Sequence, residues 1–377
     1  MCNKHIVIIR TGGNILNDQT YNCQELGLAK ALVKKNIKVS VIFAGNNRSH
    51  YIEKVNDNRF LHIYFVKFYK INQALSWFRG FFNLLENITP DIIQIHEFGM
   101  LMSYVTLRWA KKHNIKTVLI QGSYRETKKP IFKQFEQLFN CTFGRYIIKN
   151  IDGIGCKTLM ASNYLNRYRQ CNTSLIKIGL DINHFENPID KNWLKDLQIE
   201  GKKILLYVGV MERRRNVNFI LKLLKELPEE FILLLIGVGK ALEKLKLQAK
   251  GANIENRCCF LGQMRQEQLP SLYSIADLFL LASDYEIYGM VILESMYFGV
   301  PVISSFTAGS QTIIEDKKDG LLINYYDVYL WKEYILSIYD NHKLEDMREA
   351  AKIKIQQSYI WYKASESFIS LYESIEK

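Results

Sequence analysis

The 377-residue sequence lacks the marks of several protein classes. No apolar run reaches the ~18–20 residues that a membrane-spanning helix needs. The opening MCNKHIVIIR has only four apolar residues in a row before Arg10, which predicts a first strand rather than a signal peptide. The seven cysteines are scattered without a C-x-x-C pair, which favours a reduced cytoplasmic chain over a disulfide framework or a zinc site. Recognition-helix, zinc-knuckle and RNP-like signatures are also missing, so a nucleic-acid binder is disfavoured.

The composition of the chain indicates a large, basic, globular protein. With 48% hydrophobic and 23% charged residues, the chain is long enough for two domains of ordinary size. Its net charge of +12 is concentrated in residues 1–190, where 26 Lys and Arg accompany 13 Asp and Glu; the remainder holds 24 against 25. A basic half predicts an anionic partner, such as nucleic acid, phospholipid or a phosphorylated substrate. A solvated, lysine-rich surface is the alternative.

Short apolar runs rich in β-branched residues alternate with longer segments of helical period, such as 22–35 and 217–227. The expected strands are 5–11, 38–45, 61–67, 91–97, 116–122, 152–158 and 175–181, followed by 204–210, 231–239, 258–264, 278–283, 301–305 and 320–324. Continuous hydrophobicity is typical of parallel strands covered on both faces, so the pattern predicts an α/β fold of two doubly wound, Rossmann-like domains. The strand series restarts near residue 204. Ligands of such folds bind beyond the carboxyl ends of the strands.

One apolar stretch, ASDYEIYGMVILESMYFGVPVIS (282–304), carries two carboxylates eight positions apart. It predicts a strand, a loop with Glu286, and a helix with Glu294 about one turn inside. The first N–H groups of that helix lie where its macrodipole favours an anion. They belong to Tyr288, Gly289 and Met290. Carboxylates beside such a helix end suit a ligand with both phosphate and vicinal hydroxyls, for example a nucleotide sugar. Surface-facing glutamates are the alternative.

Three further loops follow expected strands. Gly12 and Gly13 precede a helix, so their backbone can approach a phosphate, although a plain turn is the alternative. Three arginines at 213–215 lie between a strand and an amphipathic helix, where guanidinium groups suit a diphosphate and a solvated turn is the alternative. The G-x-G at 237–239 lacks the third glycine and the later acidic residue of a dinucleotide fingerprint, which disfavours a nicotinamide enzyme.

In this order the motifs resemble those of the family-4 retaining glycosyltransferases of GT-B fold. The resemblance rests on the E-x7-E pair, on the GVPVI strand after it, on TAGSQTIIEDKKDGLLI (307–323) and on the arginine turn upstream. It extends to 253–283 and IKIGLDINHF (176–185), and it is looser in the first half. It implies two domains that face each other across a cleft. The implied parts are an N-terminal acceptor-binding domain (1–185), a linker (186–203), a C-terminal donor-binding domain (204–358) and a final helix (359–377) that returns to the first domain.

The resemblance also implies roles for individual residues. Glu294 would hold the ribose hydroxyls of the donor, Glu286 would contact the transferred sugar, and Arg215 would neutralise the diphosphate. The implied donor-binding residues are Gly12, Gly13, Arg214, Arg215, Tyr288, Gly289, Met290 and Glu294, and the implied catalytic residues are Glu286, Arg215 and His96.

Two positions depart from the family pattern. Val210 stands where the family usually has an Arg after the glycine of the turn, so that either Arg213 or Arg214 reaches the diphosphate instead or its binding is weaker. Gln121 stands where the family often has a His. His96, at the end of the neighbouring strand, is the candidate for that place, with a purely structural role as the alternative. These departures keep open a degenerate subunit that binds a nucleotide sugar without turnover.

The implied activity is a retaining transfer of a sugar from a nucleotide sugar, with UDP the expected nucleotide, without a metal or a cofactor. The expected acceptor is a glycan or a lipid-linked glycan in the synthesis of a cell-surface polysaccharide or glycolipid. Two segments of the basic first half, 71–88 and 125–149, have apolar residues at helical spacing. Both are candidates for peripheral contact with an anionic membrane on its cytoplasmic side, and packing against the sheet is the alternative.

Overall fold

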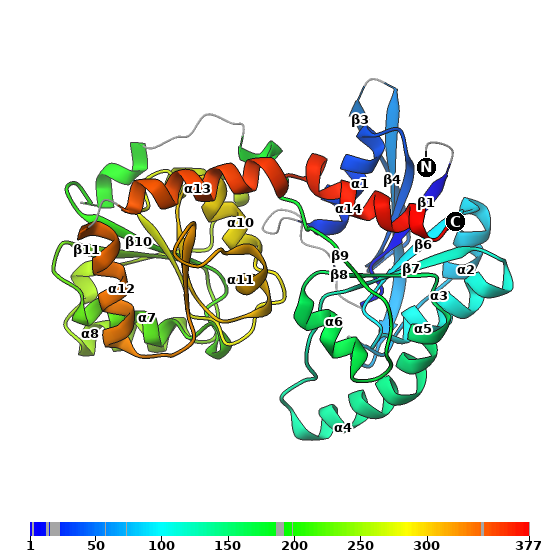
Figure 1. The fold of residues 1–377 in the computed structure, drawn as a ribbon, viewed down its shortest axis with the longest axis horizontal. Coiled ribbons are helices and arrows are strands. Elements are labelled where there is room, and N and C mark those ends of the chain that lie inside the picture. The colour runs from blue at the N-terminus through cyan, green and yellow to red at the C-terminus, as the bar shows by residue number, and fades with distance from the viewer. Residues whose placement is uncertain are drawn as a thin grey trace. The chain divides into compact units, whose positions relative to one another are not determined.

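The computed structural model describes residues 1, 4–12, 15, 23–56, 58–72, 74–185, 192–197, 199–340 and 343–376. Its contacts divide the chain into two units, and each is described by itself (Figure 1). The first unit is the N-terminal part of the chain through Gly179 together with the segment from Trp361 onward. The second unit is Leu180–Ile360. Within the described residues, the chain passes between the units at 179–180 and at 360–361.

The first unit is built on a nine-stranded sheet with parallel strands at its centre. The strand order is β3-β4-β2-β1-β6-β7-β8-β9, and β5 pairs with β4. The strands are β1 (His5–Ile9), β2 (Lys38–Gly45), β3 (Ser49–Asn56), β4 (Arg59–Lys70), β5 (Ser76–Phe78), β6 (Ile92–His96), β7 (Lys116–Gln121), β8 (Gly153–Cys156) and β9 (Ser174–Leu175). β3 and β5 run antiparallel to β4, and the other described pairs are parallel.

Helices pack around this sheet, and one of them comes from the end of the chain. They are α1 (Gln24–Lys34), α2 (Phe81–Ile88), α3 (Leu101–Lys112), α4 (Pro130–Phe139), the π-helical turn η1 (Asn140–Gly144), α5 (Arg145–Asn150), α6 (Leu159–Asn166) and α14 (Trp361–Ser374). α14 packs against α1 and β8. It buries Phe368, Leu371 and Tyr372, so its apolar face is part of the core of the first unit.

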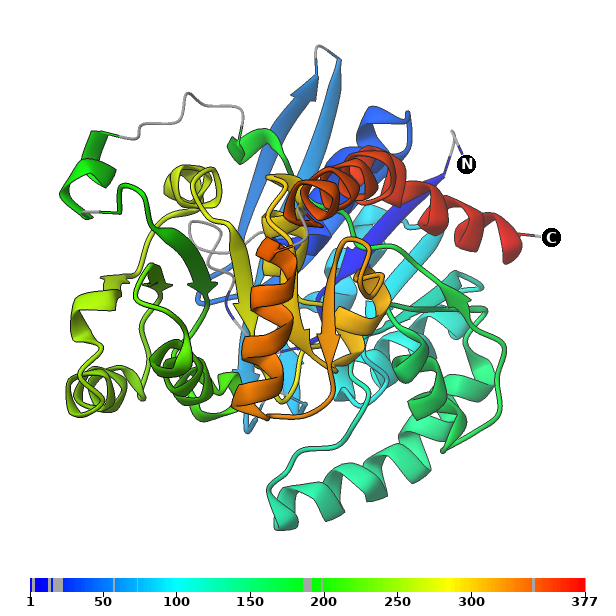
Figure 2. The same cartoon turned by 60° about the vertical axis from the view of Figure 1, so that its left-hand side comes forward.

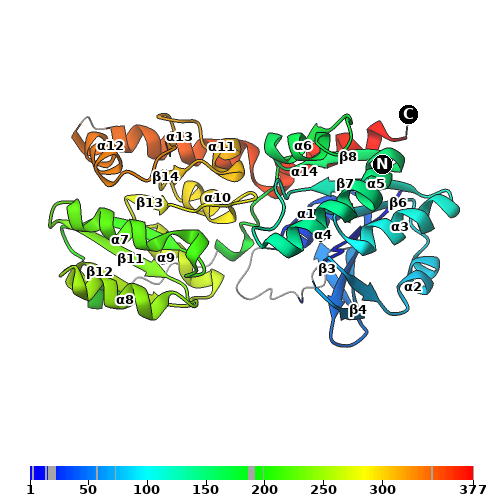
Figure 3. The same cartoon turned by 90° about the horizontal axis from the view of Figure 1, so that it is seen from below.

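The second unit has a six-stranded, fully parallel sheet in the order β12-β11-β10-β13-β14-β15 (Figures 1 and 3). The strands are β10 (Lys203–Val208), β11 (Phe231–Ile236), β12 (Cys258–Gly262), β13 (Leu278–Leu281), β14 (Val302–Ser305) and β15 (Gly320–Ile323). The helices are α7 (Val217–Glu226), α8 (Leu242–Gly251), α9 (Leu269–Tyr273), α10 (Met290–Tyr297), α11 (Ala308–Ile313), α12 (Val328–Asp340) and α13 (Lys343–Ser358). The short turns η2 (Asn183–Phe185), η3 (Asn192–Leu197), η4 (Arg213–Arg215), η5 (Glu255–Arg257) and η6 (Gln266–Gln268) complete it.

The predicted α/β architecture of two Rossmann-like units is confirmed. Every strand predicted in the second half is present, because each is a short apolar run, and all of them except the edge strand β12 are largely buried. Three details of the first half were wrong. The segment 71–88 is not one helix, since β5 lies inside it and α2 begins after Gly80, whose φ of 69° is left-handed. The strand expected over 175–181 is only β9, and β3 was missed because its residues are largely exposed.

The described helices include none that combines the length and the apolar character needed to cross a bilayer.

Candidate functional site

Three loops come together at the carboxyl edge of the second sheet. They follow β10, β13 and β14, which are neighbours in the sheet. Asp284 donates its N–H to the Arg214 carbonyl (2.8 Å), and the Arg214 guanidinium donates to the Tyr285 carbonyl (3.0 Å). Gly309, at the start of α11, donates its N–H to the Glu286 carbonyl (3.3 Å). Residues far apart in the sequence therefore share one site, at the edge where α/β folds bind ligands.

Glu286 and Arg215 form an ion pair in this site. The Glu286 side chain is 9% exposed and contacts the Arg215 guanidinium, while Arg214 Nη1 lies 4.0 Å from Glu286 Oε1. Arg214 Nε also pairs with Glu212 (2.6 Å). Burial, with the charge of Arg214 added, lowers the pKa of the Arg215 guanidinium. The two cations are thus held close together beside the Glu212 and Glu286 carboxylates.

The N-terminus of α10 adds a third source of positive potential. α10 follows Gly289, whose left-handed φ of 84° starts the helix, and no side chain caps it. The ring of Tyr288 is buried at 2% exposure, so Tyr288 can offer a ligand only its backbone. A Cβ on Gly309 would lie 1.9 Å from the Tyr288 carbonyl, so glycine is required where α11 meets this loop. Helix N–H groups that no side chain caps, beside two arginines, favour an anion.

Glu294 lies on α10, one turn beyond this N-terminus. It is 2% exposed, accepts a hydrogen bond from the Tyr273 hydroxyl (3.1 Å) and receives a longer one from the Gln266 amide (3.4 Å). Burial raises the pKa of Glu294 to about 7. The Tyr273 ring in turn stacks on Phe298, with 5.5 Å between ring centroids and 5° between planes. Sequence reasoning missed Gln266 and Tyr273, which lie 28 and 21 residues from Glu294 and belong to no local motif.

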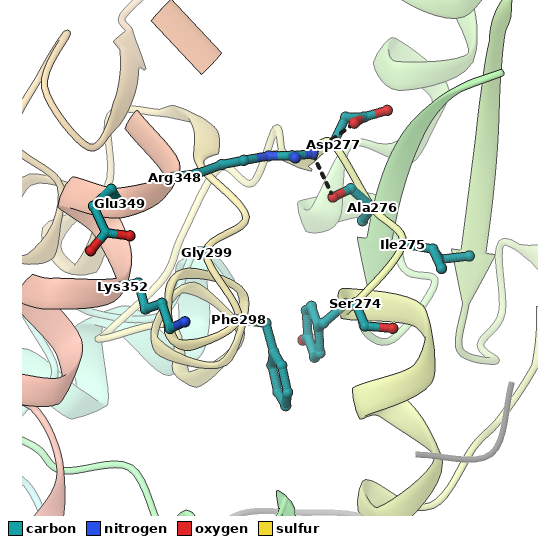
Figure 4. Close-up of a pocket in the computed structure, with 10 residues that line it drawn as sticks. Ser274, Ile275, Ala276, Asp277, Phe298, Gly299, Arg348, Glu349 and Lys352 are labelled. Carbon is teal, nitrogen blue, oxygen red and sulfur yellow. Dashed lines mark hydrogen bonds and ion pairs between the residues drawn. The ribbon is translucent and has the colours of Figure 1, made fainter. Parts of the chain in front are cut away.

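Tyr273 also lines a pocket of about 340 Å³ in the second unit (Figure 4). Arg348 extends across it and donates to the Asp277 carboxylate (2.7 Å) and the Ala276 carbonyl (3.3 Å), and Phe298 lines the pocket as well. Glu286, Glu294 and Arg215 are not among its lining residues. The pocket is therefore separate from the group of charged loops, and we do not assign the site to it.

The G-x-G at 237–239 has a packing role in the second unit. A Cβ on Gly237, whose φ is 132°, would lie 2.0 Å from the Gly209 carbonyl oxygen, and one on Gly239 would lie 2.3 Å from that of Met211. Met211 donates its N–H to the Val238 carbonyl (2.9 Å). These glycines let the β11 loop pack on the β10 loop, which explains them without a dinucleotide.

The arginine turn leaves Val210 and Arg213 at the surface. Val210 is 52% exposed, and its carbonyl accepts from the Tyr207 hydroxyl (3.1 Å). Arg213 is exposed as well, whereas Arg214 and Arg215 both contact the loop that carries Glu286. Of the two arginines considered as substitutes at Val210, Arg214 is the one placed with Glu286.

In the first unit, His96 ends β6 inside a chain of buried polar groups. Its Nε2 faces the Gln94 amide nitrogen (2.9 Å), and Gln94 accepts from the Tyr372 hydroxyl of α14. His96 Nδ1 lies 3.7 Å from Glu25 Oε1. Burial, with Lys157 and Arg10 adding to it, lowers the pKa of His96 to about 4 although Glu25 opposes the shift. His96 is therefore neutral near pH 7.

Glu25 is the anion of this group, and sequence reasoning missed it. Burial alone would raise the pKa of Glu25, but Arg10, His96 and Lys157 lower it to about 2. Arg10 Nε lies 4.0 Å from Glu25, and Lys157 donates to the Gln24 side chain (2.8 Å). No motif links the four residues in the sequence. They meet because β1, β6 and β8 end at the same edge of the sheet.

The Gln121 side chain hydrogen-bonds to the loops that follow β6 and β7. Its amide nitrogen donates to the Glu97 carboxylate (2.7 Å) and the Ser123 carbonyl (2.8 Å), and its oxygen accepts from the Phe98 N–H (3.1 Å). Glu97 has a left-handed φ of 63° and also accepts from the Gly122 N–H (3.1 Å). Gln121 thus joins the two loops.

The glycine loop after β1 is described only in part. Gly12 is half-buried, and Thr11 before it donates its hydroxyl to the His96 carbonyl. Gly13 lies outside the described residues. The roles inferred for both glycines stay predictions.

Comparison with known proteins finds similarity to glycosyltransferases. Residues 190–354 match the family described as "Glycosyl transferases group 1". Alpha-monoglucosyldiacylglycerol synthase of Streptococcus pneumoniae is 28% identical over 291 residues, which are 72% of this chain and 65% of the relative. The solved sucrose-phosphate synthase of Thermosynechococcus elongatus matches with a TM-score of 0.80 at 19% identity, over 99% of both chains. Anabaena Alr3699/HepE in complex with UDP-glucose matches with a TM-score of 0.70 at 15% identity, over 99% of this chain and 100% of that one. The chain has the GT-B fold of these solved structures, and its residues 190–354 match the group 1 glycosyltransferases, which supports a glycosyltransferase enzyme.

Proposed function

We propose that the protein transfers a sugar, with retention, from a UDP-sugar to a glycan or lipid-linked glycan in polysaccharide or glycolipid synthesis. The observation that carries the proposal is the meeting of Arg214, Arg215, Glu286 and the α10 N-terminus on adjoining loops. The structural neighbour described with UDP-glucose supports the choice of nucleotide, and the name of the pneumococcal relative supports a lipid-linked acceptor. The basic first half suits peripheral contact with an anionic membrane.

Donor binding replaces the Glu286–Arg215 ion pair by contacts of Arg215 with the diphosphate and of Glu286 with the sugar. The diphosphate takes the place of the Glu286 carboxylate on Arg215, because two phosphate charges and bidentate geometry attract a guanidinium more strongly than one carboxylate does. Glu286 is then free to accept hydrogen bonds from the hydroxyls of the sugar. Glu294 accepts from the ribose hydroxyls with the lone pairs that Tyr273 and Gln266 leave.

The same groups stabilise the departing diphosphate. As the bond from the anomeric carbon to the phosphate oxygen breaks, negative charge grows on that oxygen beside Arg214, Arg215 and the α10 N-terminus. The acceptor hydroxyl oxygen bonds to the anomeric carbon from the same face, and its proton passes to the departing phosphate oxygen. His96, neutral at pH 7, would orient a hydroxyl by hydrogen bonding and not as a charged acid. The arginines supply the positive charge, so the proposal includes neither a metal nor a cofactor.

A thermal-shift panel of nucleotide sugars tests the donor. A UDP-sugar is expected to raise Tm in a concentration-dependent way, in EDTA as well as without it, because a ligand of the folded state stabilises by mass action. Stabilisation by GDP- or ADP-sugars alone would contradict the choice of UDP, and loss of the shift in EDTA would contradict metal independence. An outcome with no response to any nucleotide sugar would overturn the donor site.

A turnover assay with the stabilising donor separates the enzyme from a degenerate binding subunit. Val210, exposed where the family has an arginine, and Gln121, committed to its loops, are the observations that favour the degenerate alternative. Release of UDP that depends on an acceptor supports transfer. Donor binding without any UDP release would support the subunit.

A further inference from the structure

The helix α4 has an apolar surface that its own unit leaves uncovered. None of its ten residues is buried, whereas the shorter α2 of the same unit buries Phe81, Leu84, Leu85 and Ile88. Its large apolar side chains are instead exposed, in part or mostly. They are Ile131 (69%), Phe132 (52%), Phe135 (68%) and Leu138 (64%). Contiguous exposed apolar surface of this kind marks an interaction site.

The exposed residues lie along one side of a continuous helical run. Ile131, Phe135 and Leu138 follow the i, i+4, i+7 spacing that aligns side chains on a helix. The run continues through η1 and α5, where Phe143 and Tyr146 are 40% and 39% exposed. α4 lies at the outer end of its unit, away from the sheet (Figures 1 and 2). The exposures of Ile131, Phe135 and Leu138 show that the rest of the described chain does not cover the stripe on α4, whereas Phe143 and Tyr146 also contact Tyr104 of α3.

The charge around α4 is positive. The segment 125–149 contains six Lys and Arg against two Asp and Glu. Both acids are engaged within the unit, since Glu126 accepts from the Tyr168 hydroxyl (2.6 Å) and Glu136 from the Thr127 N–H (2.9 Å). Lys129 and Lys133 are exposed, and the Lys129 ammonium lies 5.7 Å from the Phe132 ring. Cations therefore border the apolar stripe.

We propose that α4 is a membrane-docking helix that lies in the plane of an anionic lipid surface. The apolar stripe would enter the boundary between headgroups and acyl chains, and the lysines would contact lipid phosphates. A second copy of this chain fits the stripe less well, because it would bring the same lysines face to face. This docking surface deepens the membrane contact proposed above, and it does not depend on the identity of the donor or the sugar.

Vesicle sedimentation with matched double variants tests the docking surface. Full-length protein is expected to sediment with phosphatidylglycerol–phosphatidylcholine vesicles, less as salt rises, and little with phosphatidylcholine alone. Phe135→Ser combined with Leu138→Ser should weaken binding at least about tenfold, since it removes two exposed apolar side chains from the stripe. Tyr325→Ser combined with Tyr329→Ser, at positions 68% and 66% exposed in the second unit, is the control and should bind as the unmodified protein does. All four positions are exposed, so both double variants should keep Tm.

A tryptophan placed on the stripe gives an independent readout. Phe135→Trp should show a blue-shifted emission on addition of the anionic vesicles and quenching by bromine-labelled acyl chains. Four results would each overturn the proposal: no binding to anionic vesicles, equal loss in both double variants, equal binding to phosphatidylcholine, or no change at Trp emission. Concentration-dependent dimers that the Phe135→Ser/Leu138→Ser variant loses would assign the stripe to a second copy instead. UDP-sugar thermal shifts in the same variant would report separately on the donor proposal.

Discussion

The carboxyl edges of the two sheets carry charge in opposite ways. In the second unit, Arg214 has a side chain 40% exposed, Arg215 pairs with one carboxylate, and the α10 N-terminus has no side-chain cap. In the first unit, Glu25 is buried among Arg10, His96 and Lys157, and its charge is compensated within that group. At one edge two arginines lie beside an uncapped helix end, and at the other two cations and a neutral histidine surround one buried carboxylate.

This difference fits the two substrates of a sugar transfer. A nucleotide diphosphate is an anion, and it needs cations whose present partners can be exchanged for phosphate. An acceptor hydroxyl is neutral, and it needs fixed hydrogen-bonding groups more than free charge. We therefore expect substitutions at the second edge to change donor chemistry strongly, and substitutions at the first edge to change it little.

Removing Arg215 should have the largest effect. Arg215→Ala is expected to lower kcat by about 10²–10³-fold, because one preorganised donor to a developing charge contributes about 3–4 kcal/mol. Arg215→Lys keeps a cation beside Glu286 and should recover part of the loss. UDP release from saturating donor measures both variants.

Arg213→Ala is the matched control on the same turn, since Arg213 is exposed. It should change kcat by less than about threefold. If Arg213→Ala lowered kcat as much as Arg215→Ala, Arg213 would be the substitute for the arginine missing at Val210. The assignment of Arg214 and Arg215 would then be wrong.

Glu294 should have the second largest effect, on donor affinity. Glu294→Ala removes the acceptor for the ribose hydroxyls and is expected to weaken donor binding about 10- to 100-fold, which corresponds to the net loss of one hydrogen bond to a charged group, about 1.5–3 kcal/mol. Calorimetric titration with the donor measures it. Normal donor affinity in Glu294→Ala would remove Glu294 from the site.

Glu294→Gln separates this role from stability. The pKa of Glu294, about 7 in the folded protein, lies above its ordinary value of 4.5, so the folded state binds the extra proton between these pH values. Stability therefore falls as pH rises from about 4.5 to 7, and the lost part is absent at pH 8. Glu294→Gln should therefore raise Tm at pH 8, where its amide can also donate to the Gln266 oxygen that has no partner. Weaker donor binding together with a higher Tm excludes unfolding as the cause. A Tm at pH 8 below that of the unmodified protein would contradict this account of the buried carboxylate.

The second unit could be predicted from the sequence because its information is local. Each parallel strand is one short apolar run, largely buried except in the edge strand β12. Glu286, the α10 N-terminus and Glu294 lie within ten residues. The position of Arg215 near Glu286 could be predicted from the rule that the loops after parallel strands lie at the same edge of the sheet. Gln266 and Tyr273 could not be found in this way, because their contacts with Glu294 depend on how η6 and α9 fold beside α10.

The first unit was harder to predict for two physical reasons. β3 and β5 have exposed or short sequences whose strand state comes from pairing with β4 and not from their own pattern. The Glu25, His96 and Lys157 group is assembled from α1, β6 and the residue after β8, with no spacing that a reader of the sequence could use. The G-x-G at 237–239 is the reverse case, because it is a local motif that the sequence shows clearly but whose glycines serve packing and not ligand binding.

Gly237 tests whether the second edge depends on close packing of its loops. Gly237→Ala places a Cβ 2.0 Å from the Gly209 carbonyl oxygen, so the β10 loop must move, and we expect a loss of about 1–3 kcal/mol in the free energy of unfolding. Gly251→Ala, with no atom within 4 Å of the added Cβ, is the control and should be neutral or slightly stabilising. Chemical denaturation measures both. Equal stabilities of the two variants would contradict a packing role for Gly237.

Substitutions of two buried histidines in the first unit, His5 and His96, should have the smallest expected effect, a change in how stability depends on pH. Burial is the main cause that lowers the pKa of both His5 and His96 to about 4. The unfolded chain therefore binds more protons between about pH 4 and 6.5, so stability rises with pH across that window. Each histidine should account for about 1 kcal/mol of the change in unfolding free energy between pH 5 and 6. His5→Gln and His96→Gln should each flatten this dependence by a similar amount in denaturation measured at both pH values.

Only His96 ends a strand at the carboxyl edge, so only His96→Gln should change kcat, and donor affinity should stay the same in both. If His5→Gln lowered kcat equally, the effect of His96 would be one of stability alone, and the first edge would contribute no hydrogen-bonding group through His96.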